Sequence, residues 1–131
     1  MVTGKFDDLK HPLPYVPTVI LWGQSVQTPY FVVDTGFTGD LVVTPKIAQE
    51  LGLKIDGIEK VENANGGIVV LQTASAIAYM EGQELLVTVL ISNNRPLMGI
   101  SFMEKFKYTA IVDCINKTVK LEVAEKIIAK V

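Results

Sequence analysis

Cysteine and histidine are almost absent from this sequence. The single cysteine, Cys114, has no second cysteine in the chain with which to form a disulfide. The single histidine, His11, leaves no Cys/His cluster with metal-ligand spacing and no histidine that would activate a nucleophilic side chain. We therefore expect a protein that holds no metal and no cofactor and that resides in the reducing cytoplasm.

An excess of positive charge is also missing. The formal net charge is −2, from 12 basic and 14 acidic residues, and the basic residues form no run longer than two. Proteins that bind phosphate backbones need clustered lysine and arginine to neutralise them. Nucleic acid is therefore not expected as a partner.

Long apolar runs are lacking too. The longest, residues 85–91, falls far short of the roughly 20 residues that a membrane-spanning helix needs. Near the N-terminus, Asp7 and Asp8 stand where a signal peptide would need an apolar stretch. We expect neither a membrane partner nor secretion.

The composition that is present is typical of a compact folded domain. Hydrophobic residues make up 49% of the chain and charged residues 20%. The 131 residues suit a single domain over residues 1–131. Residues 11–17 are rich in proline, so we expect residues 1–17 to form an extended lead-in. No internal repeat is found, so any twofold symmetry has to come from a second copy of the chain.

Short segments rich in Val, Ile, Thr and Tyr recur at a spacing of about ten residues, with Gly, Asn or Pro between them. This pattern predicts a mainly β protein built from hairpins, as a sandwich or a barrel. The expected strands are residues 18–22, 30–33, 41–43, 58–62, 68–79, 84–92, 108–113 and 118–123. The expected turns are residues 23–25, 65–67, 81–82 and 116–117.

Two short helices are predicted between these strands. Thr44 is a suitable N-cap for a helix with Pro45 at its first position and Gly52 at its end. Ser101 and Glu104 have the spacing of a capping box, which predicts a second helix that runs to residue 106.

One stretch carries the chemistry. An apolar strand, residues 30–33, runs directly into Asp34, which is followed by Thr35 and Gly36. Burial at the end of such a strand disfavours the charged form of a carboxylate and makes it a useful acid or base near neutral pH. The alternative is that Asp34 only opens a turn, with Thr35 as a turn hydroxyl and Gly36 as a residue of positive φ.

A second segment strengthens the catalytic interpretation. Residues 96–102 read Pro-Leu-Met-Gly-Ile-Ser-Phe, with apolar side chains on both sides of Gly99 just before the second predicted helix. Together the two segments resemble the retropepsin-like family of aspartic proteases, and small bacterial and archaeal stand-alone members in particular. The resemblance covers residues 19–123. It implies a closed β-barrel of the acid-protease type with one or two short helices.

The resemblance also implies roles for individual residues. Asp34 would be the catalytic residue, in an active-site loop with Thr35, Gly36, Phe37 and Thr38. The later segment would pack beneath this loop through Leu97, Met98 and Gly99. Thr35 would hydrogen-bond across a twofold axis, and Gly36 would allow a tight turn and expose its carbonyl to substrate.

The chain has one Asp-Thr-Gly, so the resemblance implies a homodimer in which Asp34 faces the Asp34 of a second copy. Two carboxylates about 3 Å apart cannot both ionise and therefore share one proton. One then takes a proton from water while the other donates a proton to the scissile carbonyl. The implied activity is that of an aspartic endopeptidase acting on peptides or unfolded protein segments.

A glycine-rich hairpin at residues 61–69 is expected to cover the cleft as a flap. Its tip consists of Asn63, Ala64, Asn65, Gly66 and Gly67. The alternative is a plain surface hairpin with no role in the cleft.

The sequence departs from the family at several positions. Phe37 stands where retroviral enzymes have alanine, and its ring would narrow the cleft. Thr38 and Ile100 replace an acid and an arginine that pair in retroviral enzymes. These changes leave open a second function, a peptide-binding or dimerisation module with weak or no catalysis.

Other residues are expected to have structural roles. Residues 122–131 either interleave with a partner chain or form a helix on their own subunit. Cys114 is expected in the core, and Asp40 is expected as a polar residue of a loop or strand end.

Overall fold

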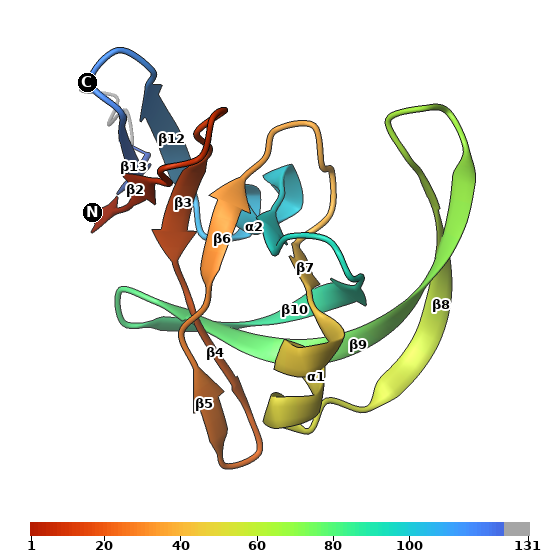
Figure 1. The fold of residues 1–131 in the computed structure, drawn as a ribbon. Coiled ribbons are helices and arrows are strands. Elements are labelled where there is room, and N and C mark those ends of the chain that lie inside the picture. The colour runs from red at the N-terminus through yellow and green to blue at the C-terminus, as the bar shows by residue number, and fades with distance from the viewer. Residues whose placement is uncertain (125–131) are drawn as a thin grey trace, which may run out of the picture.

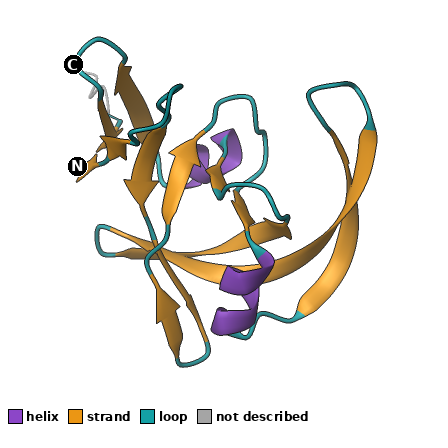
Figure 2. Ribbon diagram, viewed as in Figure 1, coloured by secondary structure: helices purple, strands orange, loops and turns teal. Residues whose placement is uncertain are grey.

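The computed structural model describes residues 1–124 and folds them mainly into strands (Figures 1 and 2). These residues form thirteen strands and two short helices, which confirms the expected mainly β fold. In chain order the elements are β1 (Val2–Thr3), β2 (Lys5–Phe6), β3 (Pro14–Pro17), β4 (Val19–Trp22), β5 (Ser25–Gln27), β6 (Tyr30–Val33), β7 (Leu41–Val43), α1 (Pro45–Leu51), β8 (Ile55–Glu62), β9 (Ile68–Met80), β10 (Gln83–Ile91), β11 (Leu97–Met98), α2 (Ile100–Lys105), β12 (Tyr108–Asp113) and β13 (Thr118–Val123).

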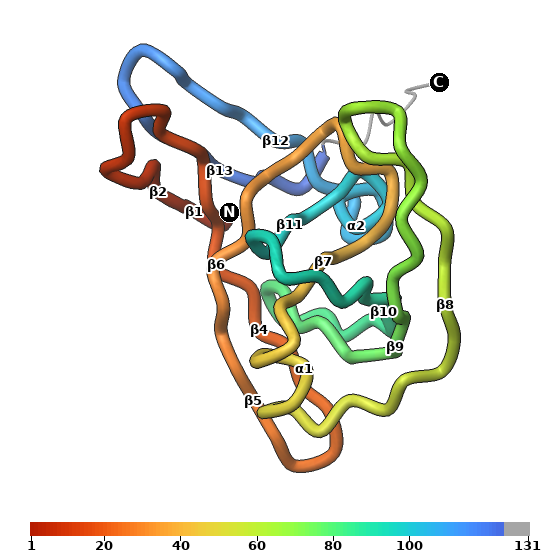
Figure 3. Tube along the Cα trace, turned by 45° about the vertical axis from the view of Figure 1, so that its right-hand side comes forward, coloured from red at the N-terminus to blue at the C-terminus, as the bar shows by residue number. Residues whose placement is uncertain are grey.

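The larger of the two sheets is curled. Its ten strands follow the order β2-β3-β6-β11-β7-β10-β9-β4-β5, with β8 paired to β9 off this path. Figures 1 and 3 show β9 and β10 running beneath β6 and β7. The expected closed barrel is not shown, because β2 and β5 end the path within residues 1–124 without pairing to each other. The sheet is a half-barrel, and a smaller sheet of order β1-β13-β12 lies beside it.

The hydrophobic core lies inside the curl of the sheet. On β9, Ala74, Ala76 and Ala78 are fully buried, whereas the residues between them are only partly buried. This alternation follows from the two-residue period of a strand with one buried face. Phe31 of β6 and Phe102 of α2 belong to the same core cluster and are its largest fully buried side chains.

The short strand β11 is inserted between β6 and β7. It runs parallel to β6, with Leu97 opposite Val32, and antiparallel to β7. Two further backbone bonds extend the pairing with β6, from Val32 N to the Pro96 carbonyl and from Asp34 N to the Met98 carbonyl, both 2.9 Å. The loop that leaves β6 therefore begins on a segment that is distant in sequence.

Helix α1 forms as its sequence predicts. Thr44 is extended at the N-cap and its hydroxyl accepts a hydrogen bond from Ile47 N at 3.2 Å. Pro45 begins the helix, and Gly52 ends it in the left-handed conformation at φ +69°. Thr44 accepts a hydrogen bond from a free N–H of the first turn, and Pro45 has no N–H to leave unpaired. The Gly52 N–H donates to carbonyls of the last turn.

The expected capping box of α2 is wrong. The N-cap is Gly99, the helix begins at Ile100, and no side chain caps it, so Ser101 and Glu104 lie within the helix. The free backbone donors of the first turn find other acceptors, because Ile100 N donates to the Phe37 carbonyl at 2.9 Å. Tertiary hydrogen bonds to the loop after β6 thus replace the side-chain cap.

Residues 1–17, expected as an extended lead-in, contain three short strands that are paired in the two sheets. Strand β3 pairs with β6, β2 pairs with β3, and β1 pairs with β13. Val16 in β3 is fully buried, so burial of this side chain draws the segment onto the sheet despite its prolines.

Smaller differences from the expectations concern turns and strand ends. Strand β5 lies partly in an expected turn, and β8 begins at Ile55 and not at residue 58.

Cys114 is exposed and not in the core. It lies in a turn in which the Asp113 carboxylate accepts hydrogen bonds from Ile115 N at 3.0 Å and Asn116 N at 2.9 Å, and this turn holds the residue in solvent.

No helix within residues 1–124 is long and apolar enough to cross a membrane. The alternatives for residues 122–131, interleaving or a terminal helix, concern a segment of which residues 125–131 lie outside the described part.

The N-cap of α1 provides a test of the fold. Replacing Thr44 by alanine removes the acceptor for Ile47 N, so Thr44→Ala is expected to lower the free energy of unfolding by about 1 kcal/mol. Thr44→Ser keeps a hydroxyl and is expected to stay near wild type. Urea unfolding of the three proteins measures the difference, and equal stability of Thr44→Ala and wild type would contradict this account of the cap.

Candidate active site

Asp34 lies at the end of a buried strand. Phe31, Val32 and Val33 of β6 are buried, and the chain then turns into a loop of residues 34–40, here called the Asp34 loop. Asp34 N donates to the Met98 carbonyl at 2.9 Å, and Asp34 Oδ1 accepts from Gly36 N at 2.9 Å. The carboxylate is thus fixed to its own loop while remaining partly exposed.

The Asp34 loop rests on the segment that contains Gly99. Gly99 N donates to the Asp40 carbonyl at 2.9 Å, and Ser101 N donates to the Thr38 carbonyl at 3.3 Å. A methyl group on Gly99 would lie 2.2 Å from the Gly39 carbonyl oxygen and 2.6 Å from the Phe37 carbonyl oxygen. Only glycine allows this approach without moving the backbone.

The segment predicted to support the loop therefore lies against it. Leu97 and Met98 form β11, and Met98 is fully buried, between the strands that enter and leave the Asp34 loop.

The remaining loop residues differ in exposure. Thr35, Gly36 and Thr38 are exposed, so they are accessible to a second molecule. The Phe37 ring is partly buried and folds back over its own loop. The ring lies so close to Gly39 that a methyl group added to this glycine would be 2.7 Å from the Phe37 Cζ atom. Phe37 also lines a pocket beside the loop.

The predicted flap is the tip of the β8–β9 hairpin. Asn63 Oδ1 accepts hydrogen bonds from Asn65 N at 3.1 Å and Gly67 N at 2.9 Å, and Gly66 has φ +80°. Figures 1 and 3 show the hairpin rising beside the Asp34 loop. Both strands of the hairpin are largely exposed toward this tip.

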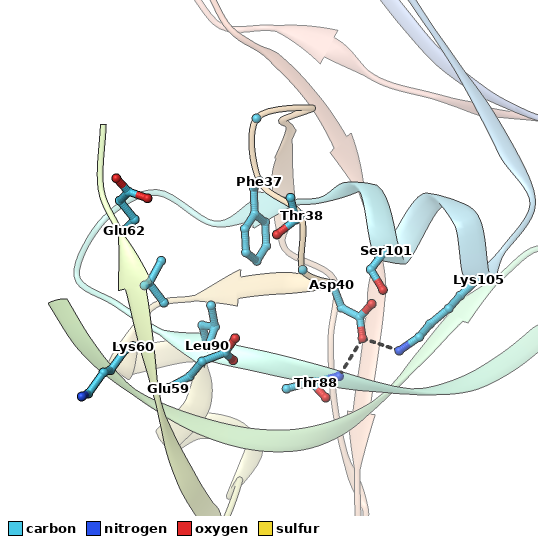
Figure 4. A pocket seen from close by; sticks show the side chains of 13 residues that line it. Phe37, Thr38, Asp40, Glu59, Lys60, Glu62, Thr88, Leu90, Ser101 and Lys105 are labelled. Atoms are coloured by element: carbon cyan, nitrogen blue, oxygen red, sulfur yellow. Dashed lines mark hydrogen bonds and ion pairs between the residues drawn. The ribbon is translucent and has the colours of Figure 1, made fainter. Parts of the chain in front are cut away.

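A pocket of about 560 Å³ separates the Asp34 loop from the hairpin (Figure 4). Residues 36–40 form one wall, and α2 and β10 contribute to its base. The opposite wall is formed by residues 59–62 of β8, and not by the tip residues Asn63, Ala64, Asn65, Gly66 and Gly67. The predicted hairpin, residues 61–69, therefore contributes Val61 and Glu62 to this wall, while Glu59 and Lys60 lie before its predicted start.

An ion pair at this pocket was not anticipated. Asp40 is 5% exposed, and its Oδ2 accepts hydrogen bonds from Lys105 Nζ at 2.6 Å and from Thr88 N at 2.9 Å. Figure 4 shows this carboxylate linking the loop to α2 and to β10. Nothing in the sequence around Asp40 indicates a partner 65 residues away.

The ion pair lies near Thr38 and Ile100, two of the positions at which the sequence departs from the resembled family. Thr38 and Ile100 contribute backbone hydrogen bonds between the loop and the start of α2. Asp40 and Lys105 add a charged link one helical turn further along. The loop is therefore held to α2 at both ends of this short helix.

The structure resembles solved proteases. It superposes with a TM-score of 0.57 on a retropepsin-like aspartic protease from Rickettsia conorii, with 18% sequence identity over 92% of this chain and 87% of that chain. It superposes equally well, at 0.57, on EIAV protease in complex with the inhibitor HBY-793, with 14% identity over 76% of this chain and 91% of that chain. No protein-family model matches the sequence, and no curated protein matches it.

These likenesses confirm the sequence resemblance at the level of the fold. The chain has the retropepsin-like fold over most of its length. Because the identities are 14% and 18%, the likeness shows the fold and does not by itself assign an activity.

The contact at Gly99 provides a second test. Gly99→Ala places a methyl group against two backbone carbonyls, so the free energy of unfolding is expected to fall by about 2 kcal/mol or more. Gly23 has open space around its α carbon and φ +58°, so Gly23→Ala is expected to cost only about 1 kcal/mol in backbone strain. Urea unfolding compares the two, and a Gly99→Ala protein no less stable than Gly23→Ala would contradict the close packing.

The ion pair between Asp40 and Lys105 provides a third test. Lys105→Met leaves the buried Asp40 carboxylate without its cation, which is expected to cost about 2 kcal/mol, less than for a fully buried pair because the Lys105 side chain is 40% exposed. Asp40→Asn combined with Lys105→Met is expected to be less destabilised than the sum of the single variants. Additive losses in a double-mutant cycle would show that the two residues do not interact.

Proposed function

We propose that this chain is a homodimeric aspartic endopeptidase that hydrolyses peptide bonds with water activated by Asp34 and the Asp34 of a second copy. The observation that carries the proposal is the placement of Asp34. It ends a buried strand, is held by the Met98 carbonyl and by Gly36 N, and lies in an Asp-Thr-Gly loop next to a pocket under a hairpin. The retropepsin-like fold supports the same conclusion.

The proposed reaction needs two carboxylates with one proton between them. Like charges held close cannot both ionise, so one aspartate is an acid while the other is a base. The ionised aspartate takes a proton from water as the water oxygen attacks the carbonyl carbon. The protonated aspartate donates its proton to the carbonyl oxygen. The proton then held by the first aspartate passes to the amide nitrogen as the C–N bond breaks, and a hydroxyl proton of the tetrahedral intermediate returns to the second aspartate, which restores the dyad with one proton. No metal or cofactor takes part in this scheme.

A second copy of the chain is required because the sequence contains one Asp-Thr-Gly. Thr35 and Gly36 are exposed next to the partly exposed Asp34, so a second loop can approach without disturbing the core. In the proposed dimer Thr35 hydrogen-bonds across the twofold axis and keeps the two loops in register. A monomer has half of the dyad and is expected to be inactive.

The other predicted residues act around this dyad in our proposal. Gly36, Phe37 and Thr38 border the substrate, while Leu97, Met98 and Gly99 hold the loop from beneath. The hairpin tip, Asn63 to Gly67, closes over bound peptide and limits the access of water. We take residues 1–131 as a single domain, the substrates as peptides or unfolded protein segments, and the location as the cytoplasm, where one cysteine needs no disulfide partner.

One observation favours a second function. The Phe37 ring lines the pocket beside the loop, and in this second proposal it narrows the space for a substrate backbone. A catalytically weak peptide-binding or dimerisation module would keep this geometry. The intact Asp-Thr-Gly favours the enzyme, since a scaffold gains no stability from two facing carboxylates.

The dyad is tested by Asp34→Asn. Asparagine can still accept the hydrogen bond from Gly36 N, so the fold is expected to persist while peptide cleavage falls by about 100-fold or more through loss of the acid and base. Asp8→Asn makes the same change at an exposed position and serves as the matched control. Cleavage of a fluorescent peptide library from acidic to neutral pH, together with the molecular mass in solution, measures both parts of the proposal.

Two results would contradict parts of this proposal. A folded dimer that cleaves no peptide at any pH, with Asp34→Asn indistinguishable in peptide binding, favours the binding module. Full activity from a monomer would contradict the shared dyad.

A further inference from the structure

The pocket beside the Asp34 loop has walls of different chemical character (Figure 4). The Phe37 ring and the side chains of Val61 and Leu90 provide apolar surface. Charged side chains enter from three elements, the loop, β8 and α2. A site of this kind accommodates a side chain with a long apolar stem and a charged end.

The charge at the base of the pocket is largely compensated. Asp40 Oδ2 is bonded to Lys105 Nζ at 2.6 Å, so this pair contributes one negative and one positive charge. Asp40 Oδ1 is buried and has no hydrogen-bond partner within the described residues. Because this oxygen is buried, it does not face the pocket as an acceptor, and the ion pair leaves the base of the pocket close to neutral.

The charge on the hairpin wall is not compensated. Of the three charged residues of β8 that line the pocket, Figure 4 shows Glu59 directed into the pocket and Lys60 directed away from it. This arrangement follows from the alternation of side chains along a strand. Glu62 extends toward the hairpin turn, where Gly66 lies near its carboxylate. Glu59 forms no ion pair within the described residues, so the groups that face the pocket carry one net negative charge.

We propose that this pocket selects a basic side chain of the substrate, arginine or lysine, whose stem lies along Phe37 and Leu90 and whose charge lies near Glu59. This inference rests on the proposed function, because it names the substrate preference of the same cleft. The volume of about 560 Å³ is ample for one long side chain. An acidic side chain would meet the Glu59 carboxylate, and a short apolar one would leave the charged end of the pocket unfilled.

The test uses peptides that differ at one position. Arginine is compared with citrulline, which has nearly the same shape without the charge, and with glutamate. Each position of a cleaved or bound peptide is scanned in turn. Cleavage is measured with wild type, and binding is measured with the full-length Asp34→Asn protein, so that the preference is recorded whether or not catalysis occurs.

Wild type is expected to favour the arginine peptide over the citrulline peptide about fivefold at low salt, as for a partly exposed ion pair, and less in high salt. Glu59→Gln is expected to reduce this preference below about twofold, and Glu59→Lys is expected to favour the glutamate peptide. Glu84→Gln removes an exposed carboxylate of β10 outside the pocket and is expected to leave the preference unchanged. Glu59 is exposed, so its variants are expected to fold, and their melting temperatures check this.

The outcomes separate the two proposals. Cleavage without a basic preference, or a preference that Glu59→Gln does not alter, overturns this inference and leaves the endopeptidase intact. Glu59-dependent binding of arginine peptides without any cleavage supports the pocket and overturns the endopeptidase. Neither binding nor cleavage of any peptide overturns both.

Discussion

The candidate active site depends on the insertion of β11 between β6 and β7. This short strand is bonded on one side to the strand that ends at Asp34 and on the other to the strand that begins after Asp40. The Gly99 contact brings the next backbone segment against the Asp34 loop, at a distance that leaves no space for a side chain. Since the loop and the inserted segment are fixed to each other by backbone hydrogen bonds, the backbone position of Asp34 is determined by the packed core.

The same insertion explains how much of the structure the sequence could predict. Asp34, Thr35 and Gly36 were recognisable because an apolar strand leads into them, and the cap of α1 was recognisable because its signals are local. The start of α2 was misplaced because its first backbone donors are satisfied by the carbonyls of residues 37 and 38, which a local capping rule does not consider. The N-terminal strands escaped prediction because their pairing with β6 and β13 is non-local.

The ion pair between Asp40 and Lys105 belongs to the same class of non-local feature. Its two residues carry no shared motif, and only the fold brings them within hydrogen-bond distance. Here the pair has two consequences. It ties the end of the Asp34 loop to α2, and it neutralises the base of the pocket, so that the uncompensated charge of the cleft comes from Glu59 on the hairpin. The same ion pair thus fixes the position of the Asp34 loop and sets the polarity of the pocket base.

The central claim is that one active site is built from two copies of Asp34. It is tested most directly by mixing wild type with Asp34→Asn at constant total concentration, refolding the mixtures together, and measuring peptide cleavage against the fraction of wild type. If the dyad is shared, mixed dimers are inactive and activity follows the square of that fraction, about one quarter at equal amounts. Activity proportional to the fraction, about one half at equal amounts, would show that each chain works alone and would contradict the account.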